Sequence, residues 1–144
     1  MQISPDFWRY IGRCKKDRFV NRNYHALTTK YNVLFNGNEA FIKGEEDLFK
    51  NYQDNFWEVL PIERVQDLEE TMMPGQSKNE NFVRAETKAT KAIQKHSMNI
   101  GGQERNSQID ESYLLLGKAR YHDGRFLPAI EALNYVMYKY PESS

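Results

Sequence analysis

The sequence has little of several features that common functions need. It has one cysteine, Cys14, so it cannot form an intramolecular disulfide or a zinc site built on cysteines. No apolar run approaches the roughly eighteen residues that a membrane-spanning helix requires. It has no excess charge of either sign, because 20 basic and 20 acidic side chains cancel. We therefore expect no transmembrane span and no attraction to nucleic acid.

The patterns of common catalytic and cofactor sites are missing too. His25, His96 and His122 lack the spacing of metal ligands. Gly101 and Gly102 do not begin a phosphate loop, and no Gly-x-Ser-x-Gly or Cys/His signature occurs. We expect no catalytic, cofactor-binding or metal-binding residues, so the protein is predicted not to be an enzyme. A helical hydrolase or enzyme accessory is the alternative if a pocket gathers titratable groups.

What the sequence does have is helical periodicity, which predicts an all-α fold of about five helices. Apolar residues spaced three and four apart predict a helix from Asn23 to near Gly44: Tyr24, Leu27, Tyr31, Leu34, Phe35, Phe41 and Ile42. Gly37 within this helix suggests that a neighbouring backbone packs close. Three acids after Gly44 suit the start of a second, antiparallel helix, whose apolar face is Leu48, Phe49, Tyr52, Phe56 and Trp57.

Three more helices follow. Phe82, Ala85, Ala89 and Ile93 predict a third helix, which ends before the glycines at 101 and 102. Asp110 can cap a fourth helix, and after a break at Gly124 a fifth runs from about Arg125 to Pro141. Its predicted inward residues are Phe126, Ala129, Ile130, Leu133, Val136, Met137 and Tyr140. The domain division is a flexible arm over residues 1–20 and a helical domain over 21–144, with a loop near 58–80.

Residues 113–141, YLLLGKARYHDGRFLPAIEALNYVMYKYP, resemble the tetratricopeptide repeat of about 34 residues. The match consists of Tyr113, Leu116, Gly117, Gly124, Phe126, Ala129, Leu133 and Pro141. The aromatic expected at 120 is displaced to Tyr121. Gly37, Gly44 and Pro61 have the separations of Gly117, Gly124 and Pro141 and suggest a faint second copy. The resemblance implies antiparallel helix pairs stacked as a solenoid. Because single repeats cannot bury their faces, we expect a fragment of a longer repeat protein.

Three stretches together resemble one family: CKKDRFVNRNYHALTTKYNVLFNGNEA, KAIQKHSMNIGGQERN and DESYLLLGKARYHDGRFLPAIEALNYV. They are similar to the N-terminal part of the SprE/PorW lipoproteins of the Bacteroidota type IX secretion and gliding-motility system. This resemblance implies a scaffold at the periplasmic face of the outer membrane that helps to link the secretion channel to the trans-envelope machinery. It also implies that Cys14 is the lipid anchor and that components of this machinery are the partners.

The residues before Cys14 leave an alternative open. A lipoprotein signal needs an apolar core and a small residue before the cysteine, but Asp6, Arg9 and Arg13 interrupt this segment. If this start is genuine, we expect a cytoplasmic tetratricopeptide adaptor that binds a peptide or partner protein. In either case Lys118 and Arg120 are candidate partner contacts, because a basic side chain in a concave groove can hold a peptide carboxylate.

Overall fold

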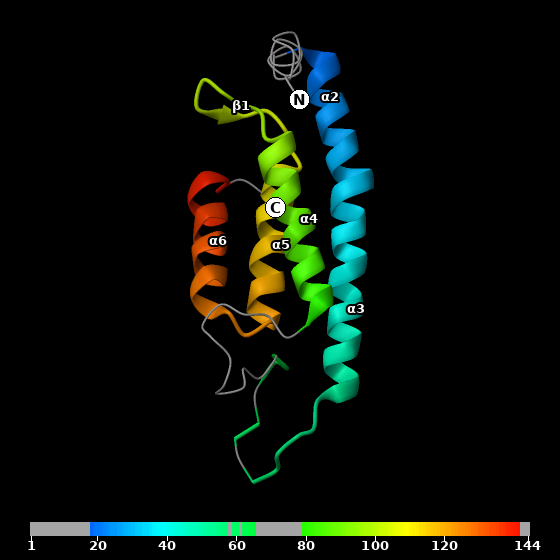
Figure 1. Ribbon diagram of the computed structural model, residues 1–144. Coiled ribbons are helices and arrows are strands. Elements are labelled where there is room, and N and C mark those ends of the chain that lie inside the picture. Colours follow the sequence, from blue (N-terminus) through cyan, green and yellow to red (C-terminus); the bar gives the residue numbers. More distant parts are fainter. Residues whose placement is uncertain (1–17, 58, 61, 66–78, 142–144) are drawn as a thin grey trace, which may run out of the picture.

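The computed structural model describes residues 18–57, 59, 60, 62–65 and 79–141. Within these residues, four helices pack side by side (Figure 1). The first is a long continuous helix, here called the rod, made of α2 (Phe19–Thr28), the π-helix η1 (Thr29–Leu34) and α3 (Phe35–Asn51). The others are α4 (Glu80–His96), α5 (Ile109–His122) and α6 (Phe126–Lys139). Each packs mainly on its neighbours in chain order, so the rod and α6 are the two ends of a row.

The rod corrects the prediction of two helices that meet at Gly44. Gly44 lies inside the continuous helix, and a Cβ there would come within 2.7 Å of the Phe82 ring. Gly37 is similar, since its Cβ would lie 2.8 Å from Leu115 Cδ2. Both glycines therefore allow close helix packing, as predicted for Gly37, and neither breaks the chain. Residues 45–51 continue the helix, so a separate antiparallel helix and a second repeat hairpin at this place are wrong.

The rod buries a different face from the predicted stripe. Its buried residues include small or polar ones, and Tyr24, Leu27, Tyr31, Phe35 and Ile42 are exposed, whereas Leu34 is buried as predicted. The buried set is His25, Thr29, Val33, Leu34, Gly37, Ala40, Gly44 and Leu48. Small residues let α4 approach closely, and the large apolar side chains consequently point away from it.

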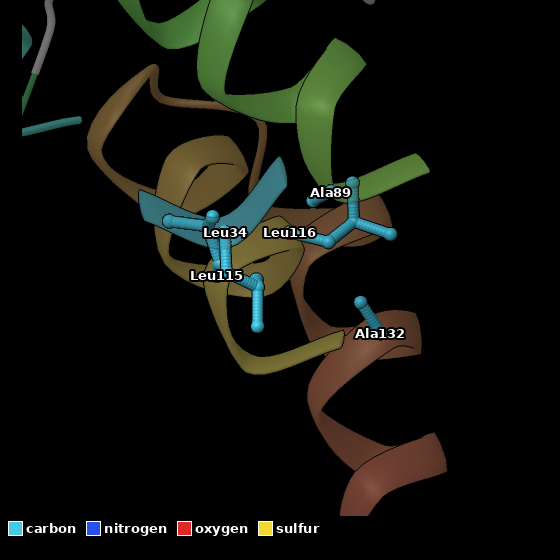
Figure 2. Close-up of a cluster of buried hydrophobic side chains, with 5 residues drawn as sticks. All are labelled: Leu34, Ala89, Leu115, Leu116 and Ala132. Atoms are coloured by element: carbon cyan, nitrogen blue, oxygen red, sulfur yellow. The ribbon is translucent and has the colours of Figure 1, made fainter. Parts of the chain in front are cut away.

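The core lies where the rod, α4, α5 and α6 meet. Figure 2 shows its largest cluster, made of Leu34, Ala89, Leu115, Leu116 and Ala132. A second cluster joins Ala40, Ala85 and Ala119 across the rod, α4 and α5. The third helix was predicted correctly, because Phe82, Ala85 and Ala89 are fully buried in α4. Alanines on α4 suit its position between two neighbours, since they allow short interhelical distances.

A short hairpin between α4 and α5 departs from an all-α fold. Strands β1 (Asn99–Ile100) and β2 (Gln103–Glu104) pair antiparallel. Gly101 and Gly102 form its turn with φ of 62° and 81°, conformations that favour glycine. The prediction that the third helix ends before these glycines is correct. The two strands were not predicted. The Glu104 carboxylate holds the hairpin by accepting hydrogen bonds from the backbone N–H of Met98 and Asn106 and from the Ser97 hydroxyl.

The turn between α5 and α6 lies where the sequence predicts it, but Asp110 does not cap α5. The helix begins at Ile109 with Gln108 at the N-cap, and Asp110 lies in the first turn. Gly124 reverses the chain with φ of 77°, and the backbone N–H of Arg125 donates to the carbonyl of Arg120, as in a glycine-capped helix end. Ala129 is buried as predicted, but Phe126, Ile130 and Met137 are exposed. This difference has a simple cause: among the described residues α6 ends the row, so its covered face is the narrow one toward α5. None of the described helices is long and apolar enough to cross a membrane.

Candidate functional site

The residues of the repeat signature form the joint between α5 and α6. A Cβ on Gly117 would lie 2.6 Å from Leu133 Cδ2, so the missing side chain lets Leu133 pack directly on the α5 backbone. The Tyr113 ring packs on Tyr135 with centroids 4.5 Å apart. Burial, followed by the neighbouring Tyr135, raises the pKa of Tyr113 above its ordinary value of 10.0. These residues hold the pair together through contacts with one another.

The outer side of α6 presents an exposed apolar surface, here called the α6 face. It consists of Phe126, Leu127, Ile130, Met137 and Tyr138. Leu127, Met137 and Tyr138 expose 79%, 72% and 88% of their surface. The spacing Leu127, Ile130, Met137 places these side chains on one side of the helix. A run of large apolar side chains open to solvent is typical of a surface that another protein covers.

A cavity of about 340 Å³ lies beside α5, and Lys118 is one of the residues that line it. Its lining is Phe41, Glu45, Glu63, Lys118, Tyr121, His122 and Leu133. The volume falls within the range of small-ligand pockets, which begins at about 300 Å³. A hydrogen bond to Glu63 raises the pKa of Tyr121 above its ordinary value of 10.0. The predicted partner contact Lys118 thus stands in a pocket with two carboxylates and a histidine.

The titratable groups of this cavity are close together but are not arranged as a proton relay. His122 Nε2 lies 3.7 Å from Glu45 Oε1. The other ring nitrogen, Nδ1, is buried without a hydrogen-bond partner, and Phe41 and Phe82 pack against the ring. A histidine paired with a carboxylate works as a base through its second nitrogen, which must reach the substrate. Here Nδ1 is buried among the aromatic rings, and Nε2 is the nitrogen on the side of the Glu45 carboxylate.

Arg120, the second predicted partner contact, is held inside the molecule. Its Nε donates to Glu86 Oε1 at 2.8 Å, and its Nη1 donates to the Pro128 carbonyl. Arg125 binds the same Glu86 carboxylate and also Asp123, which is fully buried. Burial opposes ionisation of Glu86, but the hydrogen bonds and positive charges of Arg125 and Arg120 outweigh it and lower the pKa of Glu86. These ion pairs tie α4 to the α5–α6 turn.

Sequence spacing gave no sign that two histidines would meet. His25 of α2 and His96 at the end of α4 bring their Nδ1 atoms within 3.2 Å, although 71 residues separate them. Asn106 closes this polar cluster, because its Nδ2 donates to Thr29 Oγ1 and to the His96 carbonyl. Among the described residues, no group of three or more histidine, cysteine or acidic side chains could hold a metal ion. The two histidines meet because the rod and α4 pack together in the fold, and the spacing of residues along the sequence does not show this contact.

The predicted lipid anchor, Cys14, lies outside the described residues, as do residues 1–17 of the predicted arm and 66–78 of the predicted loop. Comparison of the sequence with protein-family models and with curated proteins finds no match. The interpretation of function therefore depends on the residues that carry the two resemblances and on the geometry of the helix row.

Proposed function

We propose that this protein is a helical-repeat scaffold that binds other proteins, of the kind that the SprE/PorW resemblance implies. In this proposal it stands at the periplasmic face of the outer membrane, anchored through a lipid on Cys14. It helps to link the secretion channel to the trans-envelope machinery of gliding and type IX secretion. The helix pairs act as a tetratricopeptide-like array, and the protein works through shape and surface without catalysis.

The observation that carries the proposal is the α6 face. Five large apolar side chains lie on the outer side of a 14-residue helix, and the same helix is fixed from behind by Leu133 on Gly117. A rigid helix with a free apolar side is what a second helix pair or a partner helix can cover. Ala129 and Ala132 are buried on the opposite side. Phe126, at the start of the face, also packs on Tyr121 of α5, with ring centroids 5.7 Å apart.

The contacts of the signature residues support the tetratricopeptide-like interpretation. Gly117 faces Leu133, and Gly124 makes the turn, as the resemblance requires. The sequential packing of the rod, α4, α5 and α6 is compatible with an array in which each helix contacts the next. Lys118 stays available in its cavity for an acidic group of the partner, while Arg120 has a structural role.

A photo-cross-linking amino acid in place of Met137 tests the proposal in the cells that make the protein. We expect a cross-link to an envelope component of the secretion machinery. The matched control is the same substitution at Gln94, an exposed position on α4, where we expect no cross-link. Absence of any cross-link from Met137, or equal cross-linking from both positions, would contradict the proposal.

The alternative is a cytosolic tetratricopeptide adaptor that binds a peptide or partner protein. Mass spectrometry of the protein purified from its own cells separates the two proposals. Acylation of Cys14 supports the outer-membrane scaffold. An unmodified Cys14 together with a cytosolic partner cross-linked at Met137 supports the adaptor.

A further inference from the structure

The rod carries an apolar line on the side opposite to its buried residues. Its members are Val20, Leu27, Phe35, Ile42 and Phe49, whose exposed fractions range from 48% to 73%. The rod forms one end of the helix row (Figure 1). Phe49, the last member, also contacts the Arg64 guanidinium, 5.2 Å from its ring centroid. Five large side chains thus form a solvent-facing line along almost the whole rod.

The spacing of this line follows the geometry of the rod. Val20 and Leu27 are seven residues apart, and so are Phe35, Ile42 and Phe49, but Leu27 and Phe35 are eight apart. The extra residue falls within η1 (Thr29–Leu34). A π-helix accommodates an additional residue, so η1 keeps the two halves of the line on one side. An apolar repeat of seven residues is typical of helices that pair with another helix.

A second line beside the first specifies direction. It runs Tyr24, Tyr31, Glu39, Glu46, with spacings of seven, eight and seven, and all four residues are exposed. If two rods pair antiparallel, this line of one rod faces the same line of the other. Tyr24 of each rod then meets Glu46 of the other, and Tyr31 meets Glu39, so that each tyrosine hydroxyl can donate to a carboxylate. In a parallel two-fold pair this line would lie on opposite flanks of the two helices, so its tyrosines and glutamates would not meet.

The charge of the rod is also divided between its halves. Residues 19–38 contain two basic and no acidic side chains, and the basic Arg18 directly precedes them. Residues 39–51 contain four acidic and two basic side chains. An antiparallel pair of rods places the positive half of each beside the negative half of the other, whereas a parallel pair sets like charges together. Complementary potentials of this kind select both partner and orientation.

We propose that the rod pairs antiparallel with the rod of a second copy of this chain. The two-fold axis passes near Phe35, which meets its own equivalent. Leu27 then packs against Ile42, and Val20 packs against Phe49, at both ends of the same interface. Such a self-complementary surface is what a closed two-fold dimer needs. The α6 face lies at the other end of the row, so this dimer is independent of the proposed function.

Sedimentation velocity of the full chain over a concentration series tests association. We expect the chain to dimerise. Phe35→Glu places two carboxylates at the axis, so the dimer dissociation constant should rise more than about 100-fold. The matched control is Met137→Glu on the α6 face, which should leave the dimer intact. Circular dichroism checks that both variants remain helical, which their exposed positions allow. A chain that stays monomeric throughout the series overturns the proposal.

Thiol cross-linking tests the orientation in a Cys14→Ser background. Proteins with Leu27→Cys and Ile42→Cys are mixed and treated with a short bifunctional thiol reagent. We expect a cross-linked pair from the mixture, a self-cross-linked pair from Phe35→Cys, and none from Leu27→Cys alone. Strong cross-linking of Leu27→Cys to itself indicates a parallel dimer and overturns the proposal. So does a cross-link in cells from position 35 to a different protein while the pure chain remains monomeric.

Discussion

Gly117 is the single residue that allows α5 and α6 to pack closely. The Leu133 side chain occupies the space that a Cβ would need, with Cδ2 at 2.6 Å and Cγ at 2.7 Å. Both atoms belong to one side chain that is half-buried between the helices. The sequence analysis identified both Gly117 and Leu133 as residues of the repeat pattern, and the structure shows that they contact each other.

Gly117→Ala should lower the free energy of unfolding by about 1 kcal/mol. Overpacking costs roughly 1–3 kcal/mol, and the better helix propensity of alanine returns up to about 1 kcal/mol. In a Leu133→Ala background the clash is gone, so the same substitution should become neutral or stabilising. Urea unfolding of the four proteins of this cycle measures the change of sign. Equal destabilisation in both backgrounds would show that Leu133 does not fill the place of the missing Cβ.

Glu86 should make stability depend on pH in the acidic range. Its folded pKa is lowered from 4.5 because Arg125 and Arg120 bind the carboxylate, against the opposing effect of burial. The ion pairs therefore contribute fully above pH 4.5, and the contribution is lost as the pH falls through the lowered folded pKa. Glu86→Gln should cost about 2 kcal/mol at neutral pH and flatten this loss. Thermal unfolding between pH 7 and pH 3 tests it, with the exposed Glu131→Gln as control. A Glu86→Gln protein with unchanged pH dependence would contradict the assignment.

The polar contacts at this scale were beyond prediction from the sequence. Arg120 was expected to face a partner, but Glu86, 34 residues earlier, binds it. His25 and His96 are likewise joined across 71 residues. Periodicity tells which side of a helix is apolar, but it does not say which helix covers that side. Pairs of this kind depend on the order of the helices in the row.

Among the elements, the turn at Gly124 was predictable and the rod was not. A glycine followed by a new apolar period marks a helix end, and the structure has one there. Gly44 gave the same signal, yet the helix continues because the Phe82 ring packs where a side chain would stand. Local propensity weighs against glycine in a helix by only about 1 kcal/mol, which a good tertiary contact can offset. The two glycines differ in φ, which the sequence does not reveal.

Gly124→Ala should destabilise the α5–α6 pair by about 1 kcal/mol, because a Cβ is strained at φ of 77°. Gly124→Asn should cost less, since asparagine tolerates the left-handed region better than alanine. Chemical denaturation of the three proteins gives the order glycine, asparagine, alanine from most to least stable. An alanine variant as stable as the natural protein would mean that another backbone conformation is available at this turn.

For the whole molecule, the row of helices determines what is offered to partners. The rod and α6 stand at opposite ends of the row (Figure 1). Each has large apolar side chains that are exposed to solvent. The sequence predicted helices of the right kind but assigned these apolar residues to the core. The prediction placed every apolar face in the core, but in the part of the chain that the structure describes each end helix packs on a neighbouring helix on one side only.

The most direct measurement is the affinity of the purified protein for the partner that cross-links at Met137. Ile130 lies in the middle of the α6 face and is 53% exposed, so Ile130→Glu should leave the fold intact. We predict that this variant binds at least about tenfold more weakly, as expected for a charge in the centre of an apolar interface. Gln94→Glu on α4 should bind like the natural protein. Equal affinity for Ile130→Glu and the natural protein would contradict a scaffold that binds through α6.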